Sequence, residues 1–446
     1  MMNPKFKLRA VVTAAALALP MTAAMATNGM LMEGYGPIST GMGGASQAID
    51  HGNAAMAQNP ATLGMMEDGS SRLDLAIGIL GPDVKSSIPA FGMSADSKGT
   101  SYIMPAFGYV KRNGAYTYGV GMFAQGGMGT EYDATSFMAG GSAATARSEL
   151  GVGNLIFPLA YQVNPNLTVG ATLKYMWSSL DMMMAATGMQ LAGMAQASGV
   201  APTGNLANAL PALAGAPWAR VAFSDSNDFT GAAKATGFGA SLGATYKVNK
   251  DVVLGGSYQF KSALSDMKTA SSAASMTAPG FVDNGQITVI DFQMPSVLAV
   301  GASWQVNPSL LLAADLKYIG WADAMKSFRM RYDSSGMGGS VNFAMQQDWK
   351  DQSVLNLGMA WKANEQLTLR AGLNLAGNPV PDTYVNPLFP AIVKDHVTLG
   401  FGYKVSPVDE LNASVTMAPK VTVTSGQGVE ISHGQTNWQF MYSHRF

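Results

Sequence analysis

The segment Trp304-Gln-Val-Asn-Pro-Ser-Leu-Leu-Leu312 ends one apolar stretch on an aromatic residue, makes a short polar turn and begins a second apolar stretch. Asn and Pro favour a tight turn, because Asn tolerates left-handed backbone angles and Pro fixes φ. An aromatic ring at a strand end is typical of the interface between membrane and water. The segment therefore predicts two transmembrane β-strands joined by a short turn.

The same pattern recurs along the chain. Copies begin at Tyr161, Tyr246, Trp361 and Tyr403, and a looser copy begins at Tyr109. Transmembrane barrels have short turns on the periplasmic side and long loops outside. With both termini on the periplasmic side, these six turns predict an all-β fold, a 14-stranded antiparallel transmembrane β-barrel.

The expected strands alternate as the wall of such a barrel does. Leu73, Leu75 and Ile77 alternate with Arg72 and Asp74, so that one face suits lipid and the other the lumen. A soluble β-sandwich, for example a periplasmic one, alternates too. The chain ends on Trp438-Gln-Phe-Met-Tyr-Ser-His-Arg-Phe446, and a last strand that closes on Phe resembles the signal read by the outer-membrane assembly machinery.

The first residues indicate export. A positive stretch (Lys5, Lys7 and Arg9), a short apolar run and Ala24-Met25-Ala26 predict a signal peptide over residues 1–26. No later stretch offers the roughly 18 apolar residues of a transmembrane helix. Only helices and closed barrels satisfy every backbone group in a bilayer, so a barrel is the spanning option.

The overall composition excludes other classes. The chain has 27 Lys and Arg against 28 Asp and Glu, which gives no reason to expect nucleic acid as a partner. It has no Cys, so disulfides do not stabilise it.

Residues 27–69 do not alternate and are rich in Gly, Ala, Met and Asn. A compact segment before the first strand predicts a hatch, a plug inside the lumen, with the barrel over residues 70–446. Its glycines superficially suggest a phosphate loop, but no Gly-Lys-Ser/Thr follows them.

The chain resembles the FadL family, outer-membrane transporters of long-chain fatty acids and aromatic hydrocarbons. The hatch motifs that carry the resemblance are Asn28-Gly29, Gly41-Met-Gly-Gly-Ala45, Asp50 and Asn59-Pro60-Ala61. Later motifs in the same order are Gly119-Val-Gly-Met-Phe123, Gly129-Thr-Glu-Tyr132, Pro295-Ser-Val-Leu-Ala-Val-Gly301, Asp315-Leu-Lys-Tyr318, Trp321, Asn378-Pro-Val-Pro-Asp382 and His396-Val-Thr-Leu-Gly-Phe-Gly-Tyr403. The chain departs from the family where members often carry Pro-Phe-Gly, because Gln125-Gly126-Gly127 stands there.

The resemblance implies passive diffusion of a hydrophobic ligand past the hatch and lateral exit where the third strand kinks. Gly119, Gly121, Gly126 and Gly127 mark the expected kink, since glycine weakens a strand and often marks a bulge. The alternative is that these glycines only relieve crowding against the hatch.

A long extracellular loop is expected at about residues 180–236. Met184, Gly188, Leu191 and Ala195 share one helical face there, which predicts a lid of two helices. Its methionines suit a promiscuous ligand groove, although two helices packing on each other explain them too.

Lys317 faces the lumen and could pair with a carboxylate ligand or with the plug. The candidate ligand-binding or gating residues are Asn28, Gly29, Asn59, Pro60, Ala61, Gly119, Gly121, Gly126, Met183, Met184, Leu191 and Lys317.

Catalysis and metal binding find no support, because no nucleophile-elbow motif and no zinc-ligand spacing is present. The alternatives to hydrophobic transport are a general diffusion porin, which would lack a plug, and an outer-membrane lipid hydrolase. The expected partners are a hydrophobic small molecule, outer-membrane lipid with lipopolysaccharide, and the barrel assembly machinery. No cofactor is expected, and the protein is expected to be monomeric.

Overall fold

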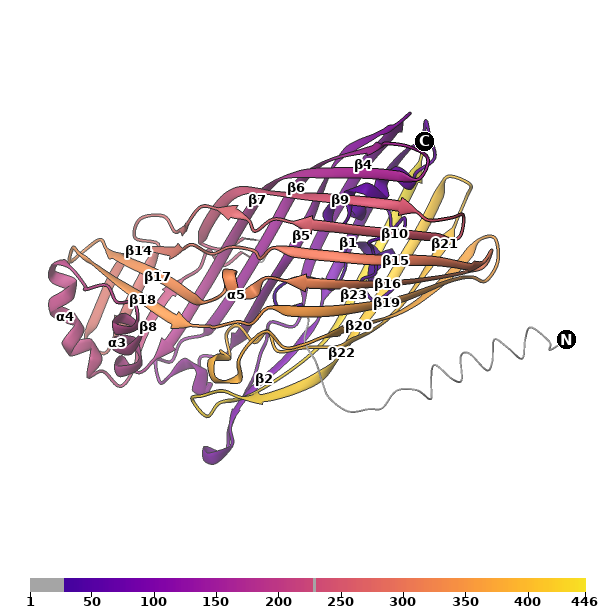
Figure 1. The fold of residues 1–446 in the computed structure, drawn as a ribbon. Helices are drawn as coiled ribbons and strands as arrows, with labels where there is room; N and C mark the ends of the chain where they lie inside the picture. Colours follow the sequence, from indigo (N-terminus) through magenta and orange to yellow (C-terminus); the bar gives the residue numbers. More distant parts are fainter. Residues whose placement is uncertain (1–27, 228–229) are drawn as a thin grey trace.

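The computed structural model describes residues 28–227 and 230–446 (Figure 1). The predicted signal peptide, residues 1–26, lies outside the described residues. The described chain forms one antiparallel sheet that closes on itself, because β1 pairs with both β4 and β23.

The wall follows the order of pairing. Its strands are β1 (Ser71–Leu80), β4 (Tyr102–Asn113), β5 (Tyr116–Tyr132), β6 (Ala146–Gln162), β7 (Leu167–Ala186), β9 (Ala233–Lys247), β10 (Val252–Gln259), β15 (Val297–Asn307), β16 (Leu310–Ile319), β19 (Gln352–Lys362), β20 (Leu367–Ala376), β21 (His396–Lys404), β22 (Asp409–Thr424) and β23 (Glu430–Arg445).

Further strands extend the sheet at the end of the barrel away from the short turns. They are β2 (Pro82–Ile88), β3 (Met93–Asp96), β8 (Ala219–Phe223), β11 (Ala263–Leu264), β12 (Met267–Lys268), β13 (Ala274–Ala278), β14 (Phe281–Ile290), β17 (Ser327–Ser334) and β18 (Ser340–Gln346).

The predicted number of fourteen strands is wrong. The described sheet contains 23 strands, and a closed circuit of 18 strands runs through the wall and through β8, β13, β14 and β12. Those four strands connect β7 to β9 beyond the level at which β7 and β9 pair directly. The prediction counted only strands next to short turns, whereas the long outer segments pair with each other and form strands as well.

The short turns lie on one rim of the barrel. Tyr161 pairs with Tyr116, Tyr246 with Leu167 and Trp304 with Val252, so each aromatic residue sits where a strand meets a turn. The last residue closes the same rim, since the amide of Phe446 donates to the backbone oxygen of Ser71 at 2.9 Å. Side chains on the outer face of the strands, such as Leu75 and Trp438, are exposed, as a lipid-facing wall requires.

Inside the barrel lies the hatch (residues 28–69). It contains α2 (Gly36–Thr40), η1 (Asn53–Ala57) and η2 (Pro60–Met65), and almost all of its side chains up to Met66 are buried. The hatch backbone touches the wall directly. At Gly43, whose φ is +69°, an added Cβ would lie 2.4 Å from the backbone oxygen of Leu373, so only glycine fits there.

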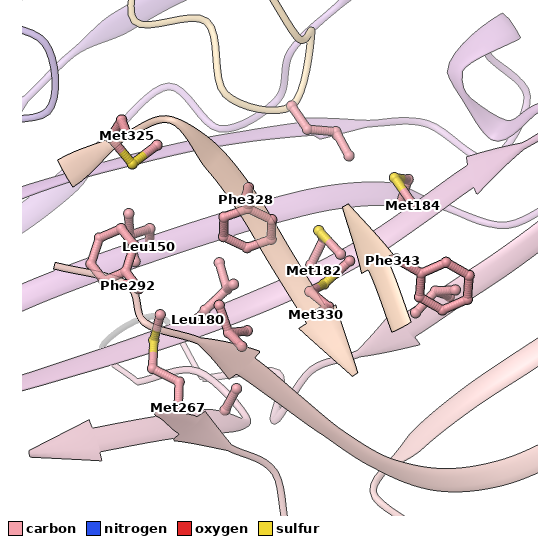
Figure 2. Packing of buried hydrophobic residues seen from close by; sticks show 14 of the residues in the cluster. Leu150, Leu180, Met182, Met184, Met267, Phe292, Met325, Phe328, Met330 and Phe343 are labelled. Carbon is pink, nitrogen blue, oxygen red and sulfur yellow. The ribbon is translucent and has the colours of Figure 1, made fainter. Parts of the chain in front are cut away.

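The end of the barrel away from the short turns is a packed dome. Helices α3 (Gly188–Ala197) and α4 (Gly204–Ala214) cover it together with β8, β13, β14, β17 and β18 (Figure 1). Figure 2 shows the methionines and phenylalanines of its core, among them Met182, Met330 and Phe343. The remaining short helices are η3 (Pro89–Phe91), η4 (Phe137–Ala139), α5 (Trp321–Ala324) and η5 (Asp382–Tyr384).

The expected loop at residues 180–236 is shorter than predicted. Strand β7 continues to Ala186, since Met183 pairs with Arg147 of β6 and with Ala222 of β8. Met184 therefore belongs to a strand and not to the helical face predicted for it. Among the described residues, none of the helices combines the length and apolarity needed to cross a membrane.

Candidate functional site: a window in the barrel wall

The wall is interrupted between β4 and β5. The two strands pair from Asn113 opposite Tyr116 up to Phe107 opposite Met122, and the pairing ends there. Above that level β4 pairs only with β1, and β5 pairs only with β6. The described strands thus leave two unpaired edges facing each other.

The interruption is a window with an upper end. The amide of Lys98 donates to the backbone oxygen of Glu131 at 2.7 Å, and the amide of Glu131 donates to Oγ of Ser97 at 3.0 Å. Strand β5 is also irregular within the window, because its register against β6 shifts between Ala124 and Gly126. Gln125 is the extra residue of this bulge, and its backbone oxygen accepts a hydrogen bond from the Tyr35 hydroxyl at 2.8 Å.

A cavity of about 310 Å³ lies at the window. On the lumen side it is lined by the hatch residues from Gly29 to Glu33. On the wall it is lined by both window edges, for example Met104 and Phe123, and by parts of β6 and β7. His433 and Asn437 add polar atoms at its border. Most of the lining is apolar, which suits a hydrophobic ligand.

A smaller cavity of about 40 Å³ lies between the hatch and the wall strands β1 and β4. The two cavities share Met32, Met104, Phe123 and Ala124, so these side chains separate them. Tyr35 and Asp74 line the smaller cavity, which is nearer to the turn rim.

The hatch approaches β5 at the bulge. Leu31 forms an isolated antiparallel bridge with Gly126, and a Cβ at Gly126 would lie 2.0 Å from the backbone oxygen of Met30. The hatch backbone therefore covers part of the edge that β4 leaves unpaired, which reduces the cost of exposing backbone groups in a bilayer.

Charged side chains fix the hatch to the wall. Arg72 donates from both terminal nitrogens to the two carboxylate oxygens of Asp50, each at 3.1 Å. Asp315 accepts from the amides of Ser46 and Gln47 at 2.7 and 3.1 Å. The hatch is therefore held by charge-assisted hydrogen bonds on opposite strands of the barrel.

Comparison with known proteins bears on this arrangement. The pattern of the family described as outer membrane protein transport protein (OMPP1/FadL/TodX) matches residues 13–444. The chain belongs to this family. Its members lie in the outer membrane, and this chain has their closed β-barrel.

Solved structures agree. The P. putida toluene transporter TodX is 32% identical, with a TM-score of 0.82, over 93% of this chain and 99% of that one. The Ralstonia pickettii toluene transporter TbuX is 30% identical, with a TM-score of 0.78, over 93% and 99%. A Pseudomonas aeruginosa FadL homologue is 16% identical with a TM-score of 0.70 over 94% and 99%, which shows the same fold.

One curated relative matches a short segment. An uncharacterized protein from the 5′ region of a phosphoenolpyruvate carboxykinase gene of Chlorobium limicola is 52% identical over 63 residues. That match spans 14% of this chain and 31% of the relative's length.

Two of the predicted glycines, Gly126 and Gly127, line the window of this FadL-type barrel, whereas Gly119 and Gly121 lie in the part of β5 that still pairs with β4. A Cβ at Gly121 would lie 2.6 Å from Sδ of Met56 in the hatch and 2.8 Å from the backbone oxygen of Phe107. One at Gly119 would lie 2.1 Å from the backbone oxygen of Tyr109. Gly121 and Gly126 therefore make room for the hatch, whereas Gly119 makes room for the neighbouring strand β4.

Asn59, Pro60 and Ala61 lie against the wall at β7 and β9. The side-chain amide of Asn59 donates to the backbone oxygens of Gln47 and Ala244 at 2.8 and 3.2 Å. A Cβ at Gly170 would lie 2.7 Å from the amide nitrogen of Ala61, so this motif fills the space against β7 and β9.

The start of the hatch lies nearer to the window. Gly29 lines the larger cavity, and at its φ of +67° an added Cβ would meet the Trp321 ring at 2.8 Å. Asn28 is buried beside it, and its side chain donates weakly to the backbone oxygen of Met32 at 3.5 Å.

Two other predicted groups lie elsewhere. Lys317 donates to the backbone oxygens of Glu33 and Gly44, so it binds the hatch. Met183, Met184 and Leu191 belong to the dome, and neither of the two cavities described above is lined by them. In the same dome the Tyr332 hydroxyl donates to Asp283 at 2.8 Å, and burial together with this carboxylate raises the pKa of Tyr332.

Sequence reasoning missed most of the lining of the larger cavity. Met104 on β4, Leu150 on β6 and Trp177 on β7 come from separate strands, and no local motif marks them. The alternation along β7 contained one usable signal, since it places Trp177 on the same face as Leu173 and Tyr175. In the described residues no group of three or more His, Asp or Glu side chains is arranged to hold a metal ion.

Proposed function

We propose that this protein admits small aromatic hydrocarbons such as toluene and releases them sideways into the bilayer through the window between β4 and β5. The observation that carries the proposal is the cavity that joins the hatch to the unpaired edges of these strands. The two toluene transporters at 30% identity or more support the choice of an aromatic hydrocarbon over a fatty acid.

Lateral release suits such a ligand energetically. An apolar molecule gains about 25 cal/mol for each Å² kept out of water, so passing from an apolar cavity directly into lipid avoids rehydration. Unpaired strand edges in lipid ordinarily cost several kcal/mol per group. Here the hatch at Leu31 covers part of the β5 edge, which makes the window tolerable.

The alternatives receive less support. A general diffusion porin needs an open aqueous lumen, whereas the hatch occupies this one. A hydrolase is not favoured, because the family and the similar structures are transport proteins. We also propose that residues 27–69 act as the hatch of a barrel over residues 70–446. We likewise propose that the chain functions as a monomer, contacts lipopolysaccharide and is inserted by the barrel assembly machinery.

The test fills the window. Ala124 lines both cavities, so Ala124→Trp should block the passage without touching the rim. Ala171→Trp is the matched control, because Ala171 is exposed on the outer face of β7 and lines neither cavity. Uptake of labelled toluene is measured in cells that lack other transporters of this family.

We expect the wild type and Ala171→Trp to raise toluene uptake above that of empty-vector cells, and Ala124→Trp to fall to that background. Surface labelling checks that all three reach the outer membrane in equal amounts. Equal uptake by Ala124→Trp and wild type would disprove passage through the window, and no uptake by the wild type would disprove toluene transport.

A further inference from the structure

The larger cavity does not stop at the lumen side of the wall. Along β7 the residues Thr172, Lys174, Met176 and Ser178 are buried, whereas Ala171, Leu173 and Tyr175 are exposed. Since successive side chains of a strand alternate, Trp177 and Ser179 lie on the outer face with Leu173 and Tyr175. Both Trp177 and Ser179 nevertheless line the cavity that begins at the hatch.

On the neighbouring strand β6, residues of the outer face line the cavity as well. Phe157 and Leu159 are exposed on its outer face, and the same parity places Gly151 and Gly153 there too. Both glycines line the cavity. One continuous hollow therefore runs from the hatch through the window onto the outside of β5, β6 and β7. We name the outer part, formed by Gly151, Gly153, Trp177 and Ser179, the outer shelf.

Trp177 lies flat on the floor of the outer shelf. Gly153 and Trp177 are direct partners in the pairing of β6 with β7. A Cβ added to Gly153 would lie 2.4 Å from Cε2 and Cζ2 of the Trp177 ring and 2.7 Å from its Nε1. The indole therefore packs against the backbone of β6. A side chain larger than glycine at position 153 would occupy the space that the ring fills.

This position differs from that of the other outward tryptophans. Trp438 is 46% exposed on the outer face of β23, pairs in a stacked arrangement with Phe440, and lines neither cavity. Trp177, by contrast, is half-buried although it lies on the outer face, and it borders the opening through which the ligand leaves.

We propose that the outer shelf is a second binding site, on the lipid side of the window, at which the Trp177 ring receives an aromatic hydrocarbon before it enters the bilayer. The inference rests on the proposed function. An aromatic ligand stacks on the flat indole, whereas an alkane gains no more there than against any apolar side chain. Trp177 therefore selects for aromatic ligands at the exit, and the occupant is the ligand and not a lipid chain because the hollow is continuous with the lumen.

The test measures two ligands in the same cells. Initial uptake of labelled toluene and of labelled octane is compared for wild type, Trp177→Leu, Trp177→Phe and the control Trp438→Leu. Leucine keeps an apolar side chain but removes the flat ring, and phenylalanine restores a ring. A second variant, Gly153→Ala, keeps the Trp177 residue but displaces its ring from the backbone of β6. Surface labelling and the heat-dependent gel shift of a folded barrel normalise the amounts.

For Trp177→Leu and for Gly153→Ala we expect the ratio of toluene uptake to octane uptake to fall roughly three- to tenfold, with octane uptake little changed. Trp177→Phe should regain most of the ratio, and Trp438→Leu should match the wild type. An unchanged ratio in Trp177→Leu would overturn the inference and make the outer shelf a contact for lipid chains. An equal fall for both ligands would overturn it too, since the residue would then only shape the opening.

The result for the wild type distinguishes a failure of this inference from a failure of the proposed function on which it rests. If wild-type cells take up toluene no faster than empty-vector cells, toluene transport fails and the selective site falls with it. If the wild type transports toluene and the Trp177→Leu ratio stays constant, transport stands and only the outer shelf is wrong.

Discussion

The ammonium group of Lys317 lies 2.9 Å from the backbone oxygen of Glu33 and 3.3 Å from that of Gly44, so a wall cation holds two separate parts of the hatch. Its side chain is buried, and both contacts are with the protein's own backbone. These two contacts use two of the three N–H donors of the ammonium group, and both tie the wall to the hatch. Lys317 therefore fastens the hatch.

Replacing Lys317 by Met should loosen the hatch without changing ligand preference. Hydrogen bonds from a charged group contribute about 1.5–3 kcal/mol each, so amide exchange in residues 33–45 should rise at least roughly tenfold. Uptake of toluene and of a fatty acid should change by the same factor. Lys174→Met is the control, because Lys174 is also a buried wall lysine but donates to Gln259 of the wall. Selective loss of fatty-acid uptake with unchanged exchange would mean that Lys317 binds ligand.

The ion pair of Arg72 with Asp50 should keep polar solutes out. Arg72→Met leaves Asp50 without its cation. The loss of folding stability should be smaller than the roughly 3–5 kcal/mol that follows from breaking a fully buried ion pair, because the Asp50 side chain is 36% exposed. We expect a partly displaced hatch and faster sucrose entry into liposomes that contain the variant. Arg329→Met, which breaks an ion pair with Asp291 in the dome, should leave sucrose entry unchanged. Equal entry for Arg72→Met and wild type would show that other contacts suffice.

Gly126 should be intolerant of even one added methyl group. In Gly126→Ala the new Cβ meets the backbone oxygen of Met30, and backbone cannot rotate away as a side chain does. We expect the bridge between Leu31 and Gly126 to break and the window lining to be lost, with toluene uptake reduced severalfold. Gly193→Ala is matched chemically, because nothing lies within 4 Å of a Cβ at Gly193 in α3. It should stabilise that helix by up to about 1 kcal/mol and leave uptake unchanged. Normal uptake by Gly126→Ala would show that the hatch need not touch β5.

The sequence predicted features that depend on neighbouring residues. The aromatic residue before each short turn and the alternation of Arg72 and Asp74 with leucines are local, and both match the structure. The strands inside the long outer segments depend on distant partners. Met276 pairs with Val221, for example, and nothing in either segment specifies that register. The number of strands was wrong for this reason.

The window was foreseen in part. Gly126 and Gly127 lie there and Gly119 and Gly121 do not, and the cavity lining joins the hatch to side chains from separate strands, such as Met104 and Trp177. That Gly153 leaves space for the Trp177 ring follows from the register of β6 against β7, which requires the structure.

The dome should prove separable from transport. Leu191 is buried in the dome core, whereas Met189, two residues earlier in α3, is 77% exposed. Leu191→Ala should destabilise the dome by about 2–5 kcal/mol, because it leaves a cavity in a packed core. Met189→Ala removes a side chain of similar size from the surface and should cost almost nothing. Limited proteolysis of residues 187–218 should therefore be faster in Leu191→Ala only.

Toluene uptake should stay within about twofold of wild type in both variants, since neither side chain lines the cavities at the window. The heat-dependent gel shift should also persist, because the wall strands do not depend on Leu191. If Leu191→Ala instead abolished uptake while its dome resisted protease as well as the wild type, Leu191 would contact the ligand. The extracellular methionine-rich segment would then be the capture groove that its composition predicts.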